Sequence, residues 1–192
     1  MRKAISLSAA LASLVVAGTA GAADAEPCHY SAPRNAELDA AALKSLLINL
    51  GPTDAHVQGV AGLTRIEVRG TACASNPQWL DDLRIDTARS GSEVTVTART
   101  GDHDNSFGPF GFSRYAYLKL TVSVPPALAV AIHSGSGDVV AGSLASLDFR
   151  SGSGDVVVAD VVGNLQIGAT GSGDVSIHSV KGTVNVPSKD DD

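Results

Sequence analysis

One motif occurs three times in the last third of the sequence, as Ser134 to Val140 (SGSGDVV), Ser151 to Val157 (SGSGDVV) and Gly171 to Ser176 (GSGDVS). The aspartates of the three copies, Asp138, Asp155 and Asp174, are separated by 17 and 19 residues. Such a regular period is typical of repeat architectures, in which one unit cannot bury its apolar side alone and stacks on its neighbours.

The apolar positions of the three copies align after each aspartate: first Val139, Val156 and Val175, and later Leu144, Val161 and Val180. Alternation in register predicts that like positions stack, with apolar residues inside and polar residues outside. Parallel neighbours of this kind favour right-handed connections. The pattern predicts an all-β, single-stranded β-helix or β-solenoid over residues 23–186, with an irregular N-terminal β part at 28–125, SGSGD coils at 126–186 and an acidic tail at 187–192.

In this interpretation each SGSGD stretch forms a corner of the coil. Glycine permits a positive φ at no steric cost, and Ser and Asp side chains bond back to nearby backbone. We therefore expect a tight bend once per coil. The GSG triplets do not form a GxGxxG phosphate loop, so no nucleotide site is predicted there.

The first residues have the order of a secretory signal peptide. Met1 to Lys3 is a short basic start, Ala4 to Ala17 is apolar, and Ala20 to Ala22 is a run of small residues. We expect residues 1–22 to be removed, leaving a periplasmic, secreted or cell-surface protein with no membrane span.

Cys28 and Cys73 are the two cysteines of the chain. An even count in an exported protein favours a disulfide, and there is no CxxC pair or His-rich spacing to indicate a metal site. The sequence therefore predicts a disulfide that fastens the mature N-terminus to the rest of the domain.

The charge balance argues against nucleic acid as a partner. Without Arg2 and Lys3, 14 − 2 = 12 basic residues face 20 acidic residues, a net charge of −8. A negative surface repels phosphate backbones.

Residues 36–50 carry two conflicting signals. Leu38, Ala42, Leu46 and Leu50 recur at helical spacing, yet Leu46 to Leu50 also suits a buried strand before the turn at Gly51 and Pro52. Helix and strand both stay open on these residues alone. Further on, alternation predicts strands at 56–60, 64–69 and 115–124, and a hairpin that joins 83–86 to 94–97.

Four segments together resemble the bacterial putative-adhesin family, which is related to the auto-transporter adhesin head, or GIN, domain. They are the SGSGDV repeats, Val162 to Ile167, Gly70 to Ser75 (GTACAS) and the VPSKDDD ending. The resemblance spans about Cys28 to the end and implies a right-handed β-helix, with strands rather than a helix at 36–50. It implies no catalytic residue and no cofactor.

Asp138, Asp155 and Asp174 are the sharpest chemical candidates. At equivalent corners they would lie about 5 Å apart, where like charges repel unless a cation or hydrogen-bond donors intervene. Calcium binds carboxylate and carbonyl oxygens and is one hypothesis, although one carboxylate per coil is sparse. A solvated turn is the alternative.

A cluster of aromatic residues interleaved with Gly and Pro forms the second candidate: Phe107, Phe110, Phe112, Tyr115 and Tyr117. Such an apolar segment either covers an open end or flank of the core, or presents stacking surfaces to sugars or a partner.

These features predict an exported, non-enzymatic binding, adhesin-like or scaffolding protein whose partner is a cell-envelope protein or glycan. The alternative is a polysaccharide-active β-helix enzyme. Such enzymes need clustered acidic and basic side chains on stacked coils, and the repeats offer only Arg150 and Lys181 as cations, on different coils.

Overall fold

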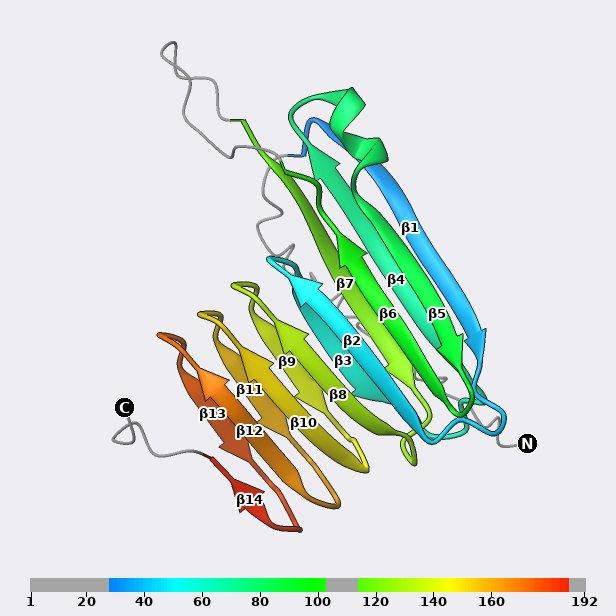
Figure 1. The fold of residues 1–192 in the computed structure, drawn as a ribbon, viewed down its shortest axis with the longest axis vertical. Helices are drawn as coiled ribbons and strands as arrows, with labels where there is room; N and C mark the ends of the chain where they lie inside the picture. Colours follow the sequence, from blue (N-terminus) through cyan, green and yellow to red (C-terminus); the bar gives the residue numbers. More distant parts are fainter. Residues whose placement is uncertain (1–27, 103–113, 187–192) are drawn as a thin grey trace, which may run out of the picture.

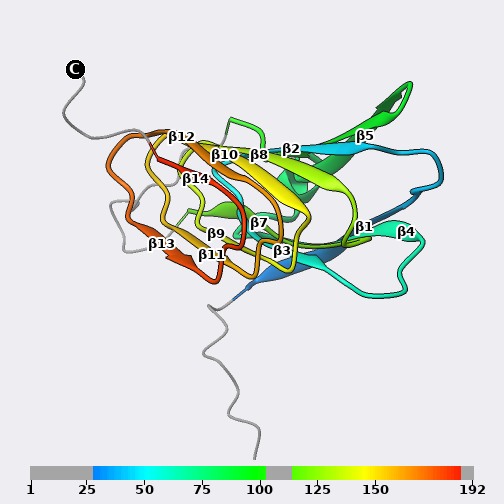
Figure 2. The same ribbon diagram turned by 90° about the horizontal axis from the view of Figure 1, so that it is seen from below.

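The computed structural model describes residues 28–102 and 114–186, which form two seven-stranded sheets packed face to face (Figures 1 and 2). Sheet A has the order β1 (Tyr30–Asp39), β4 (Arg65–Ala74), β7 (Ala116–Val124), β3 (Asp54–Gly59), β9 (Val139–Gly142), β11 (Val156–Ala159), β13 (Val175–His178). Sheet B has the order β14 (Val184–Asn185), β12 (Leu165–Thr170), β10 (Ser146–Ser151), β8 (Ala129–Ser134), β2 (Ser45–Gly51), β6 (Glu93–Arg99), β5 (Arg84–Ser90). A short 3-10 helix, η1 (Pro77–Asp81), joins β4 to β5.

The predicted β-helix or β-solenoid is wrong. Both sheets are open and mix parallel with antiparallel pairs, because β1 and β7 flank β4 in antiparallel register and β5 pairs antiparallel with β6. The prediction failed because it extended the stacking rule of the C-terminal repeats to an N-terminal half built from long antiparallel strands.

The stacking of like positions in the repeats is observed. From β8 to β14 successive strands alternate between the two sheets, and each pairs in parallel with its equivalent in the next copy. Val139, Val156 and Val175 are partners across β9, β11 and β13. Their side chains point inward, where both sheets contribute to one hydrophobic core.

Residues 36–50 are strand, not helix, which is what the family resemblance implied. They comprise the end of β1, a turn in which Ala42 has φ +63°, and β2, whose Leu46, Ile48 and Leu50 are fully buried. A leucine spacing of four fits either structure, since four is also a multiple of the two-residue strand period. The hairpin predicted to join 83–86 to 94–97 is confirmed as β5–β6.

The glycines of SGSGD serve a different purpose from the one expected. Their φ angles are not positive; the left-handed glycines of the described chain lie elsewhere, for example at Gly51 and Gly91. A Cβ on Gly154 would lie 2.1 Å from the Gly137 carbonyl oxygen, and one on Gly173 would lie 2.1 Å from that of Gly154. Successive corners stack backbone on backbone, so this position has no room for a side chain.

The left-handed residues of the repeats occur at the opposite corner. Ser143, Asp160 and Ser179, which follow β9, β11 and β13, have φ between +55° and +57°. Ser and Asp side chains tolerate this conformation better than β-branched or bulky ones. Sequence inspection missed this second periodic feature because none of the three positions is a glycine.

The predicted disulfide is present and fastens the first described residue to the body. It joins Cys28 to Cys73 of β4, with a Cα–Cα distance of 5.6 Å. Arg34 adds a second attachment, since its guanidinium donates hydrogen bonds to the carbonyl oxygens of Leu80 and Leu83 beside η1. Within the described ranges, no helix has the length and apolarity needed to cross a bilayer.

Candidate binding face

The outward side of sheet A brings together three clusters of functional side chains. Because neighbouring strands are in register, outward residues form rows that cross all seven strands. The central row contains Asn35, Arg69, Thr121, His56, Val140, Val157 and Ser176. We call this surface the A face.

The first cluster is a ladder of aspartates along one row. The backbone N–H of Asp155 donates to Oδ1 of Asp138 at 2.9 Å, and that of Asp174 donates to Oδ1 of Asp155 at 2.8 Å. A fourth member precedes them, because the N–H of Asp138 donates to Oδ1 of Asp54 at 3.1 Å. The ladder therefore runs in one direction, and the carboxylate of its last member, Asp174, accepts no hydrogen bond from any described residue.

Asp54 was not found from the sequence. The stretch Gly51 to Ala55 reads GPTDA and occupies the place of the turn SGSGDV in the later units, with one residue fewer. A Cβ on Gly137 would lie 2.2 Å from the Thr53 carbonyl oxygen, so this turn stacks beneath the first SGSGD as the SGSGD turns stack on one another. The sequence signal that could have identified Asp54 is an aspartate followed directly by a strand in which buried and exposed residues alternate.

The ladder supplies the hydrogen-bond donors that like charges at this spacing require. Each of Asp54, Asp138 and Asp155 receives a backbone N–H from the next member. In the chain as described, no group of three or more His, Cys, Asp or Glu side chains is placed to hold a metal ion. We therefore do not propose a calcium site at these aspartates.

Substitutions of the ladder aspartates should change the free energy of unfolding by amounts that depend on whether the carboxylate accepts a hydrogen bond. We expect Asp155→Ala to lower the free energy of unfolding by about 1 kcal/mol, because the N–H of Asp174 loses its acceptor. Asp155→Asn keeps an oxygen acceptor and removes a like charge, so it should unfold at or above the wild-type denaturant concentration. Asp174→Ala is the control and should change little. Equal losses for Asp155→Ala and Asp174→Ala in urea titrations would contradict a directional ladder.

The second cluster, the tyrosine patch, consists of His29, Tyr115, Tyr117 and Lys119. The Tyr115 and Tyr117 rings lie 5.9 Å apart, the N–H of His29 donates to the Tyr115 hydroxyl at 2.9 Å, and Lys119 Nζ lies 5.3 Å from the Tyr117 ring centre. Lys119 is also the Cα partner of Asp54, so the patch adjoins the start of the ladder. Phe107, Phe110 and Phe112 lie outside the described residues.

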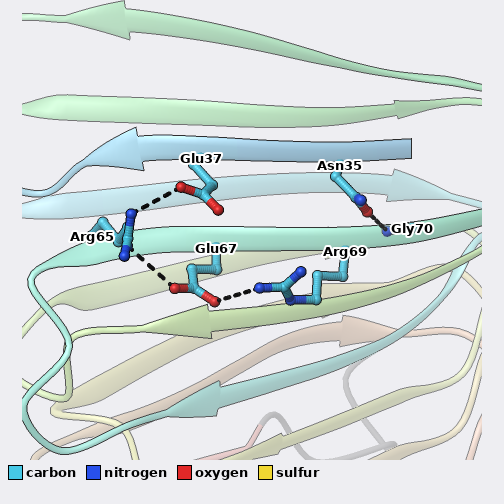
Figure 3. Close-up of polar contacts among 6 residues, drawn as sticks. All are labelled: Asn35, Glu37, Arg65, Glu67, Arg69 and Gly70. Carbon is cyan, nitrogen blue, oxygen red and sulfur yellow. Dashed lines mark hydrogen bonds and ion pairs between the residues drawn. The ribbon is translucent and has the colours of Figure 1, made fainter. Parts of the chain in front are cut away.

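The third cluster is a chain of ion pairs on β1 and β4 (Figure 3). Glu37 lies directly opposite Glu67, and Arg65 binds both carboxylates, at 3.0 and 3.3 Å. Arg69 binds the other oxygen of Glu67 at 3.1 Å. Exposed pairs like these add little stability, but they fix the directions in which the charged groups point.

The ion-pair chain adjoins the mouth of a surface hollow. A shallow depression of about 420 Å³ lies where β1 ends and β4 begins, lined by Glu37, Leu38, Asp39, Thr64 and Arg65. Beyond it, Asn35 Oδ1 accepts a hydrogen bond from the backbone N–H of Gly70 at 3.3 Å (Figure 3). Charged side chains of both signs thus border one open hollow at the edge of the A face.

Comparisons with known proteins find similar solved structures but no matching sequence family. The sequence matches no family profile and no curated protein. Among solved structures, a putative cell adhesion protein from Clostridium sporogenes is similar with a TM-score of 0.43 and 10% identity, over 81% of this chain and 98% of that one. A putative adhesin from Parabacteroides distasonis gives 0.39 and 11%, over 82% and 73%. A putative lipid binding protein from the same species gives 0.28 and 10%, over 81% and 97%.

Likeness at this level assigns neither a family nor a function to the chain. Membership in the GIN-type family, which the repeat motifs indicate, stays a prediction.

Proposed function

We propose that this chain is an exported, non-enzymatic binding or scaffolding protein of the cell envelope, and that it presents the A face to an envelope protein or glycan. The observation that carries the proposal is the convergence of the aspartate ladder, the tyrosine patch and the ion-pair chain on one outward sheet surface. Strand register fixes the backbone positions from which these side chains project, so the spacing between the three clusters is set before a ligand binds.

The chemistry of the A face suits an extended polar ligand. Carboxylates and guanidinium groups can hydrogen-bond to hydroxyl or amide groups, and the exposed edge of a tyrosine pair can contact a sugar ring. The ladder of carboxylates disfavours phosphate-rich polymers such as nucleic acids. The predicted signal peptide at 1–22 and the disulfide support placement outside the cytoplasm.

A matched pair of arginines tests which surface binds. Arg69 lies on the A face and Arg150 on the outward side of sheet B; their side chains are 63% and 62% exposed, and each binds a carboxylate two residues earlier. We expect Arg69→Ala to weaken binding to purified envelope glycans or envelope fractions about tenfold, the effect of losing roughly 1.4 kcal/mol at an interface. Arg150→Ala should leave binding unchanged.

The measurement is equilibrium binding of labelled mature protein to immobilised envelope material and to a glycan array. Equal loss in both variants, or loss in Arg150→Ala alone, would rule out the A face as the binding surface. No observation favours the polysaccharide-active enzyme considered as the alternative, and we do not propose it.

A further inference from the structure

The four end strands of the two sheets differ in how they resist pairing with another chain. β1 carries Pro33 and acidic residues, β5 carries arginines and an aspartate, and β14 is two residues long and precedes Pro187 in the sequence. Prolines, charges and short length are the usual devices that block edge-to-edge association. β13, with the sequence VSIH, has neither a proline nor an acidic or basic side chain apart from its terminal histidine.

The backbone of β13 presents hydrogen-bonding groups outward. The N–H groups of Ala55, Val139 and Val156 each donate to the carbonyl of the aspartate in the next unit, the last at 2.9 Å. Val175 is the next equivalent residue, so its N–H points away from β11 toward the open edge. The backbone groups of successive residues in a parallel strand point alternately to the two sides of the strand. The N–H and C=O groups of Ile177 therefore also point toward the open edge.

The apolar side chains at this end of the core are incompletely covered. Val156, Val158 and Val161 are no more than 1% exposed, whereas their equivalents Val175, Ile177 and Val180 are only partly buried. The difference arises because β13 is the last strand of sheet A, so no described strand lies on its outer edge. An added strand on β13 would complete this burial.

The sequence of β13 is complementary to itself in one antiparallel register. A two-fold axis through Ser176 places Val175 opposite Ile177 of the second copy, so their outward N–H and C=O groups pair reciprocally and their side chains continue the core. The same register places Asp174 opposite His178 of the second copy on the outward side. Asp174 is the ladder member whose carboxylate accepts no hydrogen bond from a described residue. In this register it can accept one from His178 of the second copy.

We propose that two copies of this chain associate through β13 in this two-fold register and extend sheet A across the pair. In sheet B, β14 pairs only with Leu165 and Gln166, so among the described residues no strand pairs with the rest of the outer edge of β12. The interface is small, which makes it a weak, concentration-dependent one. It is independent of the ligand proposed for the A face.

Sedimentation analysis of mature protein from about 1 to 500 µM, without ligand, tests the association. We expect a dimer to form at about 100 µM. Asp174→Lys removes the carboxylate that accepts from His178 of the second copy, and His178→Asp places two carboxylates opposite each other across the axis, so each should weaken the dimer about tenfold. The double variant should restore it. Glu93→Lys makes the same charge change on exposed β6 and should have no effect.

A cross-link tests the register. The axis places the two Ser176 residues directly opposite each other as a non-hydrogen-bonded pair with Cα atoms about 4.5 Å apart. Ser176→Cys should therefore give a covalent dimer under mild oxidation, with Cys28–Cys73 shown intact by peptide mapping. Thr121→Cys, in the same row but mid-sheet, should not. A monomer at all concentrations, or a dimer insensitive to the charge variants, overturns the proposal.

Discussion

Replacing Phe149 with alanine should be among the most destabilising single substitutions in this protein. Phe149 of β10 is fully buried, and its Cα partners on the two adjacent strands are Ile132 and Ile167, which are also fully buried. Truncation removes a large apolar surface and leaves a cavity that strands fixed by their neighbours cannot fill. We expect the free energy of unfolding to fall by about 3–5 kcal/mol.

The corresponding loss in Tm is roughly 6–20 °C for a domain of this size. Val157→Ala is the matched control, since Val157 lies on the adjacent repeat but faces outward and is 38% exposed. That variant should stay within about 0.5 kcal/mol of the wild type. Circular dichroism melts and urea titrations of both variants provide the measurement, and similar values for the two would show that the core does not depend on Phe149.

Removing the disulfide should give the second large effect. The Cys28→Ser, Cys73→Ser double variant frees a link between residues 45 apart in sequence. A loop of this length stabilises by roughly 4 kcal/mol on the chain-entropy model, and native disulfides of small secreted domains are worth about 2–5 kcal/mol. Cys73 is also buried, so its serine replacement places a hydroxyl in the core.

Two controls separate the cross-link from the buried hydroxyl. Cys28→Ser alone, with Cys73 kept reduced, removes the bond while preserving the buried sulfur, and reduced wild type does the same without any substitution. Both should lose most of the stability that the double variant loses. If reduction leaves the urea midpoint unchanged, β1 is held by its pairing with β4 and by Arg34 alone.

Local sequence patterns predicted the strands, and which of their side chains point into the core, better than they predicted the order of the strands in each sheet. Two-residue alternation identified the repeat strands and the β5–β6 hairpin, because it records which side of a strand meets the core. Sheet order depends on contacts far apart in sequence. β8 and β9 return to pair with β2 and β3 after the four strands β4 to β7, and the only mark of that return in the sequence is the aspartate at Asp54, in a turn that otherwise differs from SGSGD.

The candidate site was predictable only in part. Asp138, Asp155 and Asp174 were identified as equivalent because their motif repeats, but their role as acceptors for one another's backbone depends on atomic distances. Arg65 and Glu67 looked like ordinary alternating surface residues of a strand. Their significance arises from antiparallel pairing that brings Glu37 opposite Glu67.

The stacked glycine corners have a consequence for how such chains can vary. Each corner stacks on the backbone of the corner before it, as the Gly137, Gly154 and Gly173 contacts show. A duplication or deletion of one whole unit between two corners would therefore preserve every remaining contact, whereas a fragment of a unit would bring a side chain onto a backbone carbonyl. The breadth of sheet A can therefore change between related chains only in increments of whole strands.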